Sequence, residues 1–339
     1  MKKVKLGIIG TGMAWERLHF PAYQKLMDKY DIQAVCDTNR EKAQVAANAL
    51  QLPESAVYTN HERMLDEAKL EAVDCMVPIA QNYTVAKDAI SRGVHVIAEK
   101  PFAATSLEAK ELTKLASKNK VHVLVAENFR YAEENQLIKK IIEERQIGNV
   151  AYFIDNNVTE FHSDMLDNNT FASREWRQHP EFKGGVFLDS AVHHFARQRF
   201  LFGNPRTLHA AGRPSDVDFS PYSCINAMIT YENHITGHYT YFCIGKETQA
   251  PHVGLRIFGT HGQIYLESKD CGFVNVSLKD GTHQALPFAP EMGYQNELDN
   301  FYNALRFDEK IISTPEKELG DIQIIEAILD SCRRTKKAA

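Results

Sequence analysis

The strongest constraint on the fold is a regular alternation of segments between residues 4 and 125. Short apolar runs alternate with longer amphipathic runs whose apolar residues recur at helical spacing. The strand-like runs are VKLGIIG (4–10), IQAVCD (32–37), EAVDCMVP (71–78), GVHVIAEKP (93–101) and KVHVLVAEN (120–128). The helix-like runs cover 16–30, 39–50, 82–92 and 105–118, and the last opens with a Thr105-x-x-Glu108 capping box. This alternation predicts a parallel sheet with helices on both faces.

Strands dominate the second half of the chain. They are predicted within residues 150–161, 224–232, 235–245, 253–259, 262–268 and 272–278, and helices within 186–203 and 318–337. Several of these strands alternate apolar and polar residues, as in a sheet with one solvated or partner-covered face. We therefore expect an α/β chain: a first domain over 1–125 and an α+β domain over 126–319 on a mostly antiparallel open sheet. The helix of about 320–337 is expected to pack back on the first domain.

Length and charge exclude several classes of protein. The 339 residues suffice for two domains, and a net charge of −5 without a Lys/Arg-rich segment argues against nucleic acid or a membrane as partner. The six cysteines show no CxxC spacing, so we expect neither a metal site nor a disulfide framework. No apolar signal segment or membrane span is evident, which predicts a cytoplasmic protein.

A glycine-rich turn follows the first predicted strand. Gly10-Thr11-Gly12 opens a predicted helix, the context in which glycines admit a dinucleotide pyrophosphate at a helix N-terminus. The alternative is an ordinary strand-to-helix turn. Trp15 stands where the G-x-G-x-x-G pattern has a small residue, so we expect Ala14 to face the strand and Trp15 to point outward, over the cofactor or under a neighbouring loop.

An acidic residue ends the second predicted strand. Asp37 lies where a carboxylate would accept hydrogen bonds from the adenosine ribose and repel a 2′-phosphate, which favours NAD over NADP. Arg40 leaves NADP possible, because its guanidinium could pair with that phosphate or flank the adenine. It could equally be a solvated residue in the first turn of a helix.

The segment AEKPF ends another buried strand. Glu99 and Lys100 lie at the carboxyl edge of the predicted sheet, where ligands bind in open α/β folds. Pro101 restricts Lys100 to an extended conformation and so helps to direct its side chain. The alternative interpretation is a solvated Glu–Lys pair at a strand end.

The predicted helix 186–203 contains the segment DSAVHHFAR. Asp189 and His193 are four residues apart and share a helix face, with Arg197 one turn further on. They could form a proton-transfer pair in which the carboxylate orients the imidazole. A stripe of surface ion pairs is the alternative. His194 points about 100° away from His193, so we expect it to pack rather than to share a metal.

Read together, these motifs resemble the Gfo/Idh/MocA oxidoreductases over nearly the whole chain. The similar segments, in the family's order, are GIIGTGMAWERLHFPAYQKL, GVHVIAEKPFA, EWRQHPEFKGGVFLDSAVHH and LRIFGTHGQIYLE. The resemblance implies a Rossmann domain and a second domain whose open sheet often forms homodimers or homotetramers. It also implies that Lys100, Asp189 and His193 are catalytic, with a cis peptide bond common before Pro101.

The resemblance implies the remaining site residues by position. Cofactor contacts are expected from Gly10, Thr11, Gly12, Met13, Ala14, Trp15, Asp37, Arg40, Val77, Pro78, Asn82, Glu99, Lys100, Trp176, Arg177 and Tyr294. Substrate contacts are expected from Lys100, Asn128, Arg177, Asp189 and His193. The expected reaction is NAD(P)-dependent hydride transfer to or from a CH–OH group of a sugar, a polyol or a related small molecule.

Some positions depart from the family pattern. Ala196 replaces a frequent second Asp, Ala191 replaces a Gly, and Asn82 stands where histidine is common. The missing Asp argues against a simple inositol dehydrogenase. Two alternatives therefore remain beside the oxidoreductase. One is a cofactor-binding regulator or scaffold without turnover, and the other is a redox-neutral lyase or hydrolase that retains NAD.

Overall fold

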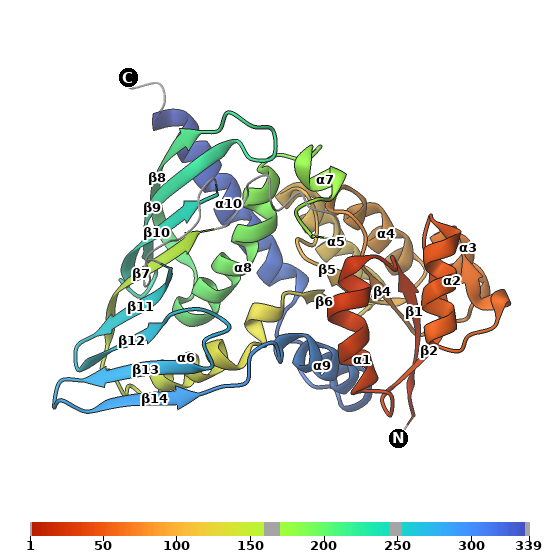
Figure 1. Cartoon of the computed structure of the whole chain (residues 1–339), viewed down its shortest axis with the longest axis horizontal. Coiled ribbons are helices and arrows are strands. Elements are labelled where there is room, and N and C mark those ends of the chain that lie inside the picture. The colour runs from red at the N-terminus through yellow and green to blue at the C-terminus, as the bar shows by residue number, and fades with distance from the viewer. Residues whose placement is uncertain (1, 159–169, 244–252, 336–339) are drawn as a thin grey trace. The chain divides into compact units, whose positions relative to one another are not determined.

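The chain forms two compact units (Figure 1). The computed structural model describes residues 2–158, 170–243 and 253–335. The first unit contains Met1–Asn128 and Gly293–Ile322, and the second contains Phe129–Met292 and the chain from Gln323 onward. The first division thus falls at residue 128, where we expected 125.

The C-terminal helix is divided differently from our expectation. We expected residues 320–337 to join the first domain, but α10 (Pro315–Thr335) belongs to the second unit from Gln323 onward. Ser331, in this part of the helix, is bonded within the second unit: its hydroxyl accepts a hydrogen bond from the Ala210 N–H at 2.8 Å and donates to the Ala210 carbonyl oxygen at 3.1 Å. The segment that returns to the first unit is Gly293–Ile322. Residues 336 and 337 of the expected helix lie outside the described residues.

The first unit contains a six-stranded sheet, sheet A, with strand order β3-β2-β1-β4-β5-β6. All of its neighbouring strands pair in parallel, as the sequence predicts. The strands are β1 (Val4–Ile9), β2 (Tyr30–Cys36), β3 (Val57–Tyr58), β4 (Ala72–Cys75), β5 (His95–Glu99) and β6 (Val123–Ala126). The chain reverses its direction of winding between β1 and β4, which is where such sheets bind ligands, at the carboxyl ends of the strands.

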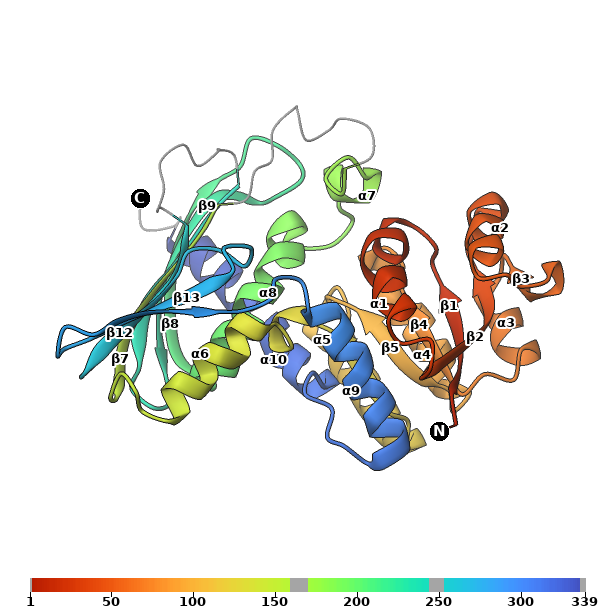
Figure 2. The same ribbon diagram turned by 60° about the horizontal axis from the view of Figure 1, so that its bottom comes forward.

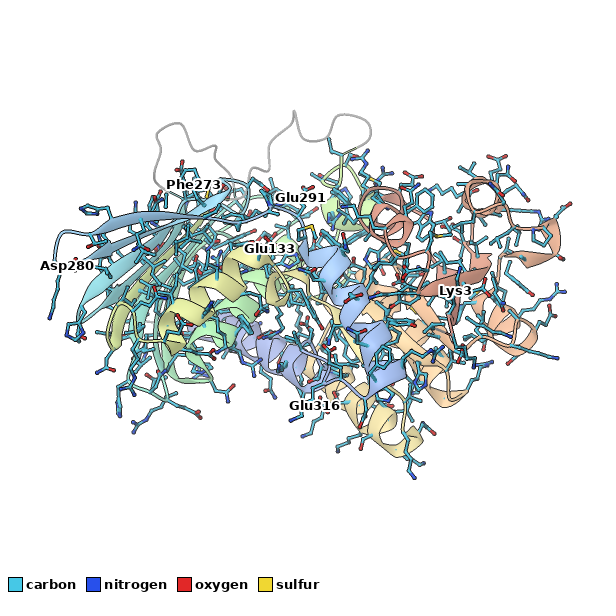
Figure 3. The ribbon with its side chains drawn as sticks, turned by 90° about the horizontal axis from the view of Figure 1, so that it is seen from below. Lys3, Glu133, Phe273, Asp280, Glu291 and Glu316 are labelled. Atoms are coloured by element: carbon cyan, nitrogen blue, oxygen red, sulfur yellow. The ribbon has the colours of Figure 1, made fainter. Side chains whose placement is uncertain are left out.

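Helices flank sheet A. They are η1 (Trp15–His19), α1 (Phe20–Gln24), α2 (Arg40–Ala49), η2 (Glu54–Ala56), α3 (His61–Glu67), α4 (Ile79–Ser91), α5 (Ser106–Asn119) and α9 (Gly293–Phe307). Helix α9 packs against α1, and α4 packs against α5 (Figure 1). Arg306 of α9 donates to the carbonyl oxygen of Lys3, which is labelled in Figure 3, at 2.9 Å. The expected cap of α5 is present, since the Thr105 hydroxyl accepts from the Glu108 N–H at 3.2 Å.

The second unit contains an eight-stranded mixed sheet, sheet B, with strand order β14-β13-β12-β11-β7-β10-β9-β8. Among the strands of sheet B that the structure describes, β7 and β10 are the one pair in parallel, which confirms the mostly antiparallel arrangement. The strands are β7 (Val150–Val158), β8 (Pro205–Pro214), β9 (Tyr222–Tyr231), β10 (Thr236–Phe242), β11 (Gly254–Gly259), β12 (Gly262–Leu266), β13 (Phe273–Leu278) and β14 (His283–Pro287). Strands β8 and β14 were not predicted from the sequence.

Helices cover one face of sheet B. These are α6 (Glu133–Glu143), α8 (Gly185–Phe202) and the second part of α10 (Figure 2); η3 (Asn128–Arg130) precedes α6, and α7 (Glu175–Gln178) precedes α8. Phe153 and Tyr239 are buried on the helix-covered side. Among the described residues, no helix lies on the opposite face of the sheet (Figure 2).

A buried ionic network attaches α8 to sheet B. Asp155 of β7 accepts hydrogen bonds from the Arg197 guanidinium at 2.6 Å and from the Gln198 amide at 2.7 Å. All three side chains are buried. Because a buried carboxylate is strongly destabilising without a partner, this network fixes the helix in rotation as well as in position.

Candidate active site

The two glycines of the first turn meet different surroundings. Gly10 has φ of +91°, and a Cβ atom there would lie 2.2 Å from the carbonyl oxygen of Met76. Only glycine fits this position without moving the backbone. A Cβ atom on Gly12 would have no atom of the described residues within 4 Å. The chain therefore needs Gly10 for its own packing, whereas Gly12 leaves open space at the start of the helical segment, as the close approach of a cofactor phosphate requires.

Asp37 is held by the glycine turn. Its Oδ2 atom accepts from the Thr11 N–H at 2.9 Å and from the Thr11 hydroxyl at 3.1 Å, and its Oδ1 atom accepts from the Asn39 N–H at 2.9 Å. The carboxylate at the end of β2 is therefore oriented before any ligand arrives. Arg40 forms an exposed ion pair with Glu54 at 2.8 Å.

Trp15 is placed differently from our expectation. Its side chain is only 2% exposed, and its ring lies 5.0 Å from that of Phe20 and 6.1 Å from that of Tyr23. The expected outward orientation is therefore wrong. The helix widens into a π turn here, in which the Phe20 N–H donates to the Trp15 carbonyl oxygen. The wider turn accommodates the indole inside the unit, and such turns occur frequently at functional sites.

A polar network lies immediately behind this turn. His19 is fully buried, with Nδ1 2.7 Å from Asp74 Oδ2 and Nε2 3.1 Å from Glu99 Oε1. The Tyr23 hydroxyl donates to the same Asp74 oxygen at 2.8 Å. Burial lowers the pKa of His19, but the two carboxylates outweigh it and hold that pKa well above 6.5. The raised pKa favours the protonated imidazole, in which both ring nitrogens donate, one to each carboxylate.

Glu297 of α9 adds a carboxyl group to this region. The side chain is completely buried, and neither of its oxygens has a hydrogen-bond partner among the described residues. Burial raises the pKa of Glu297 well above 4.5; the His19 charge opposes this shift, and three neighbouring carboxylates add to it. Glu297 is therefore a neutral acid under conditions in which an exposed glutamate is ionised.

The turn that carries Lys100 is supported from several sides. The Lys100–Pro101 peptide bond is cis, as the family resemblance implies. The Asn82 amide donates to the carbonyl oxygens of Glu99 at 3.2 Å and Pro101 at 2.7 Å. The Lys100 N–H donates to Glu99 Oε2 at 2.9 Å. These bonds hold the backbone from which the Lys100 side chain extends.

The remaining candidates of the first unit follow the carboxyl ends of neighbouring strands. Val77 and Pro78 come after β4, and Pro78 immediately precedes α4. Asn128 comes after β6 and begins η3. Tyr294 lies in the first turn of α9, with its ring 6.0 Å from that of His19. Since parallel strands end at one edge of a sheet, this edge of sheet A carries the glycine turn, Asp37, Val77, Lys100 and Asn128.

The candidates of the second unit gather around α8. Arg177 donates from Nε to Asp189 Oδ2 at 2.7 Å, and its guanidinium lies 4.3 Å from the centre of the Trp176 ring. The His193 ring stacks on Phe129 with centroids 4.7 Å apart. Asp189 and Arg197 are buried, which excludes the alternative of a solvated ion-pair stripe.

His194 lies on another side of α8 from His193. Its Nδ1 atom lies 2.9 Å from the Tyr239 hydroxyl, which agrees with the packing role expected for it. Among the residues that the structure describes, no group of three histidine, cysteine or acidic side chains is arranged to hold a metal ion.

Sequence reasoning missed His19, Tyr23, Asp74 and Glu297. Asp74 gave a usable signal, because a carboxylate in the middle of an apolar strand must have partners. Those partners could not be identified from the sequence, since His19 lies 55 residues away from Asp74 and 80 from Glu99.

The fold and this strand edge define a dinucleotide-binding protein of the Rossmann type with a second α/β unit. The chain belongs to the Gfo/Idh/MocA oxidoreductases. Residues 4–127 match the family described as an oxidoreductase family with an NAD-binding Rossmann fold, and residues 139–339 match its C-terminal alpha/beta domain. The resemblance seen in the sequence is confirmed, and with it the expectation of an NAD-binding domain. None of the helices described is long and apolar enough to cross a membrane.

Relatives of known sequence cover most of the chain. An uncharacterized protein of Saccharomyces cerevisiae is 28% identical and covers 98% of this chain and 96% of its own length. D-apiose dehydrogenase of Paraburkholderia graminis is 25% identical (87% of this chain, 75% of the relative). The scyllo-inositol 2-dehydrogenase (NADP⁺) of Bacillus subtilis is also 25% identical (84% and 71%). A solved oxidoreductase of Thermotoga maritima is 27% identical, with a TM-score of 0.87 over 98% of this chain and 97% of that one.

The different surroundings of Gly10 and Gly12 give a first prediction. Gly10→Ala should lower the free energy of unfolding by about 3 kcal/mol, because the new methyl group meets a backbone oxygen at a positive φ. Gly12→Ala should change it by less than about 1 kcal/mol but weaken NAD binding about tenfold. Urea unfolding and NAD titration of both variants measure the two effects. Equal stability losses in the two variants would contradict this assignment.

Glu297 gives a pH-dependent prediction. The unfolded chain loses the Glu297 proton near pH 4.5 and the folded unit keeps it, so stability falls as pH rises from 4.5 toward the folded pKa. His19 acts in the same direction above pH 6.5. Glu297→Gln mimics the neutral acid. Between pH 4.5 and the folded pKa of Glu297, its free energy of unfolding should rise relative to that of the wild type by about 1 kcal/mol per pH unit.

The Trp15 emission of a Trp176→Phe background reports unfolding of the first unit, measured from pH 5 to pH 8. Glu316→Gln, at an exposed position of the same unit that is labelled in Figure 3, is the matched control and should follow the wild type at every pH. A stability curve of Glu297→Gln that runs parallel to the wild-type curve would show that Glu297 is ionised in the folded chain.

Proposed function

We propose that this protein is an NAD-dependent oxidoreductase that moves hydride between the nicotinamide and a CH–OH group of a sugar or polyol. The observation that carries the proposal is the supported turn at Lys100, an ammonium group at the carboxyl edge of a Rossmann sheet. The proposed site also includes Asp189 and His193. The names of the P. graminis and B. subtilis relatives, which specify a sugar and a cyclitol, support this substrate class.

The cofactor-binding residues proposed are those of the strand edge. The glycine turn from Gly10 to Trp15 would hold the pyrophosphate, and Asp37 the adenosine ribose. Val77, Pro78, Asn82, Glu99, Tyr294, Trp176 and Arg177 complete the proposed set. NAD is favoured over NADP because Asp37 has a fixed carboxylate, whereas Arg40 is paired with Glu54. When bound, the cofactor supplies the hydride acceptor or donor.

The protein residues would handle the proton and the developing charge. His193 would take the hydroxyl proton during oxidation and return it during reduction. The Lys100 ammonium would stabilise the oxyanion that forms as the proton leaves. Asp189, whose carboxylate is oriented by Arg177 at 2.7 Å, would hold a substrate hydroxyl or the imidazole. Arg177 and Asn128 would add contacts to the substrate.

The presence of all three catalytic candidates favours turnover over a regulatory or scaffold role, because a binding protein does not need a positioned acid–base pair. The redox-neutral alternative uses the same residues and differs in its products. It predicts cofactor that stays bound during purification and sugar conversion without net NADH.

We also propose self-association through the open face of sheet B. Tyr152, Ile154, Met228 and Phe258 alternate with buried residues on their strands and point away from the helix-covered side. The exposed fraction is 48% for Met228 and 42% for Phe273 of β13. Phe273 is labelled in Figure 3. Exposed apolar patches of this kind mark protein interfaces, and a second copy of the same chain would cover this face in a homodimer or homotetramer.

The catalytic proposal is tested by NADH formation at 340 nm with a panel of aldoses and inositols, using NAD and NADP in turn. His193→Ala and Lys100→Ala should each lower kcat by about 10²–10⁴-fold while NAD still binds. His283→Ala, on the exposed strand β14, is the matched control and should retain wild-type turnover. Undiminished kcat in His193→Ala would remove that residue from the mechanism, and failure of the wild type to bind either cofactor would overturn the proposal.

The self-association proposal is tested by light scattering coupled to size-exclusion chromatography. The wild type should elute as a dimer or tetramer. Ile154→Glu combined with Met228→Glu should yield monomer, because both changes place charge in the proposed apolar interface. Ala151→Glu, at an exposed position of the same strand, is the control. A wild-type monomer at micromolar concentration would refute the interface.

A further inference from the structure

Four side chains form a continuous cluster in the first unit, here called the His19 cluster: His19, Tyr23 and Asp74, which are fully buried, and Glu99, whose side chain is 12% exposed. They come from η1, α1, β4 and β5, so the cluster joins residues that are far apart in the sequence. Their contacts are close, at 2.7 Å for His19–Asp74, 2.8 Å for Tyr23–Asp74 and 3.1 Å for His19–Glu99. Cofactor binding and proton transfer, as proposed above, use only Glu99 among them.

Glu99 connects the cluster to the proposed active site. Its two carboxylate oxygens face in different directions: Oε1 toward the His19 imidazole, and Oε2 toward the backbone N–H of Lys100 at 2.9 Å. The imidazole, the carboxylate and the Lys100 backbone are therefore joined in one chain of hydrogen bonds. A rotation of the Glu99 side chain would break both contacts together.

We propose that His19 is a positioning residue for Lys100: the imidazole fixes the Glu99 carboxylate, and Glu99 fixes the backbone from which the Lys100 side chain extends. This inference rests on the proposed role of Lys100 in hydride transfer. A cation suits the position, because it lies between two carboxylates, of which Asp74 is fully buried and would otherwise lack a compensating charge.

The charge on His19 is governed by the groups that surround it. Asp74 of β4, Glu99 of β5 and the neutral Glu297 of α9 are its acidic neighbours; the Tyr23 hydroxyl donates to the same Asp74 oxygen, and the Tyr294 ring lies 6.0 Å away. Because the two carboxylates raise the pKa of His19 well above 6.5, the imidazole keeps both N–H donors to a higher pH than an exposed histidine does. The hydrogen bond between His19 and Glu99 should therefore weaken as pH rises beyond the pKa of His19.

Two substitutions of His19 separate positioning from packing. His19→Gln places an amide near the Nε2 position and can still donate to Glu99, whereas His19→Asn places it near Nδ1 and can donate only to Asp74. The readout is hydrogen exchange of the Lys100 amide in ¹⁵N-lysine protein, identified by its absence in Lys100→Arg. His19→Asn should accelerate this exchange about tenfold relative to His19→Gln, the effect of losing one hydrogen bond to a charged group.

The chain offers a matched control pair within the same unit. His61 of α3 lies 2.8 Å from Asp88 of α4, and both side chains are partly buried. His61→Asn should leave exchange of the Lys100 amide unchanged. In turnover assays, His19→Asn should lower kcat more than it changes KM for NAD. His19→Gln should retain most of the wild-type kcat.

Equal acceleration in His19→Gln and His19→Asn would show that the imidazole only packs the unit, and would overturn the proposal. Should both variants fail to fold, Glu99→Gln decides the matter, because it keeps the side-chain size and removes the charged acceptor: unchanged Lys100 exchange in that variant overturns the proposal. The exchange measurement needs no substrate, so its failure is distinct from failure of the oxidoreductase proposal, which is read from cofactor binding and turnover.

Discussion

A carboxylate in the middle of a buried strand is the constraint on which the first unit depends. Asp74 lies in β4, whose residues are all buried, at the centre of sheet A. Its charge can persist there only with close donors, and His19 and Tyr23 supply them from the helical segment that follows the glycine turn. These two hydrogen bonds to Asp74 fix the position of that segment, and therefore of the glycine turn that precedes it.

The second unit uses the same device. Asp155 lies within β7, and Arg197 and Gln198 bind it from α8. This contact fixes the rotation of α8, so that His193, one turn before Arg197, and Asp189, two turns before it, have defined directions. In each unit, a buried strand aspartate anchors the helix that carries candidate site residues. Burial of apolar area drives folding, but these two ionic contacts determine the orientation of the helices.

Much of the fold could be predicted because periodicity is a local property. Alternating segments predicted the parallel sheet A, and the polar–apolar alternation of β9 and β10 predicted sheet B. The edge strands β8 and β14 escaped notice because β8 begins and ends with proline and β14 is almost entirely exposed. Edge strands need no strong apolar pattern to pair.

The candidate site was predictable only where a motif is contiguous. The glycine turn, Asp37 and the Lys100 turn could be found because each occupies a short segment next to a strand. The orientation of Trp15 was predicted wrongly, since a π turn changes which side of a helix a residue faces and leaves no mark in the periodic pattern. The His19 cluster joins residues from four elements, so only the three-dimensional structure reveals it.

The amide of Asn82 has a consequence for how the Lys100 turn responds to pH. Asn82 occupies a position where histidine is common in the family, and it holds two carbonyl oxygens of the Lys100 turn. A carboxamide does not gain or lose a proton near neutral pH, whereas an imidazole does. The hydrogen bonds from Asn82 to the Lys100 turn are therefore insensitive to pH. A pH response of the turn would have to come through the contacts of Glu99 with His19.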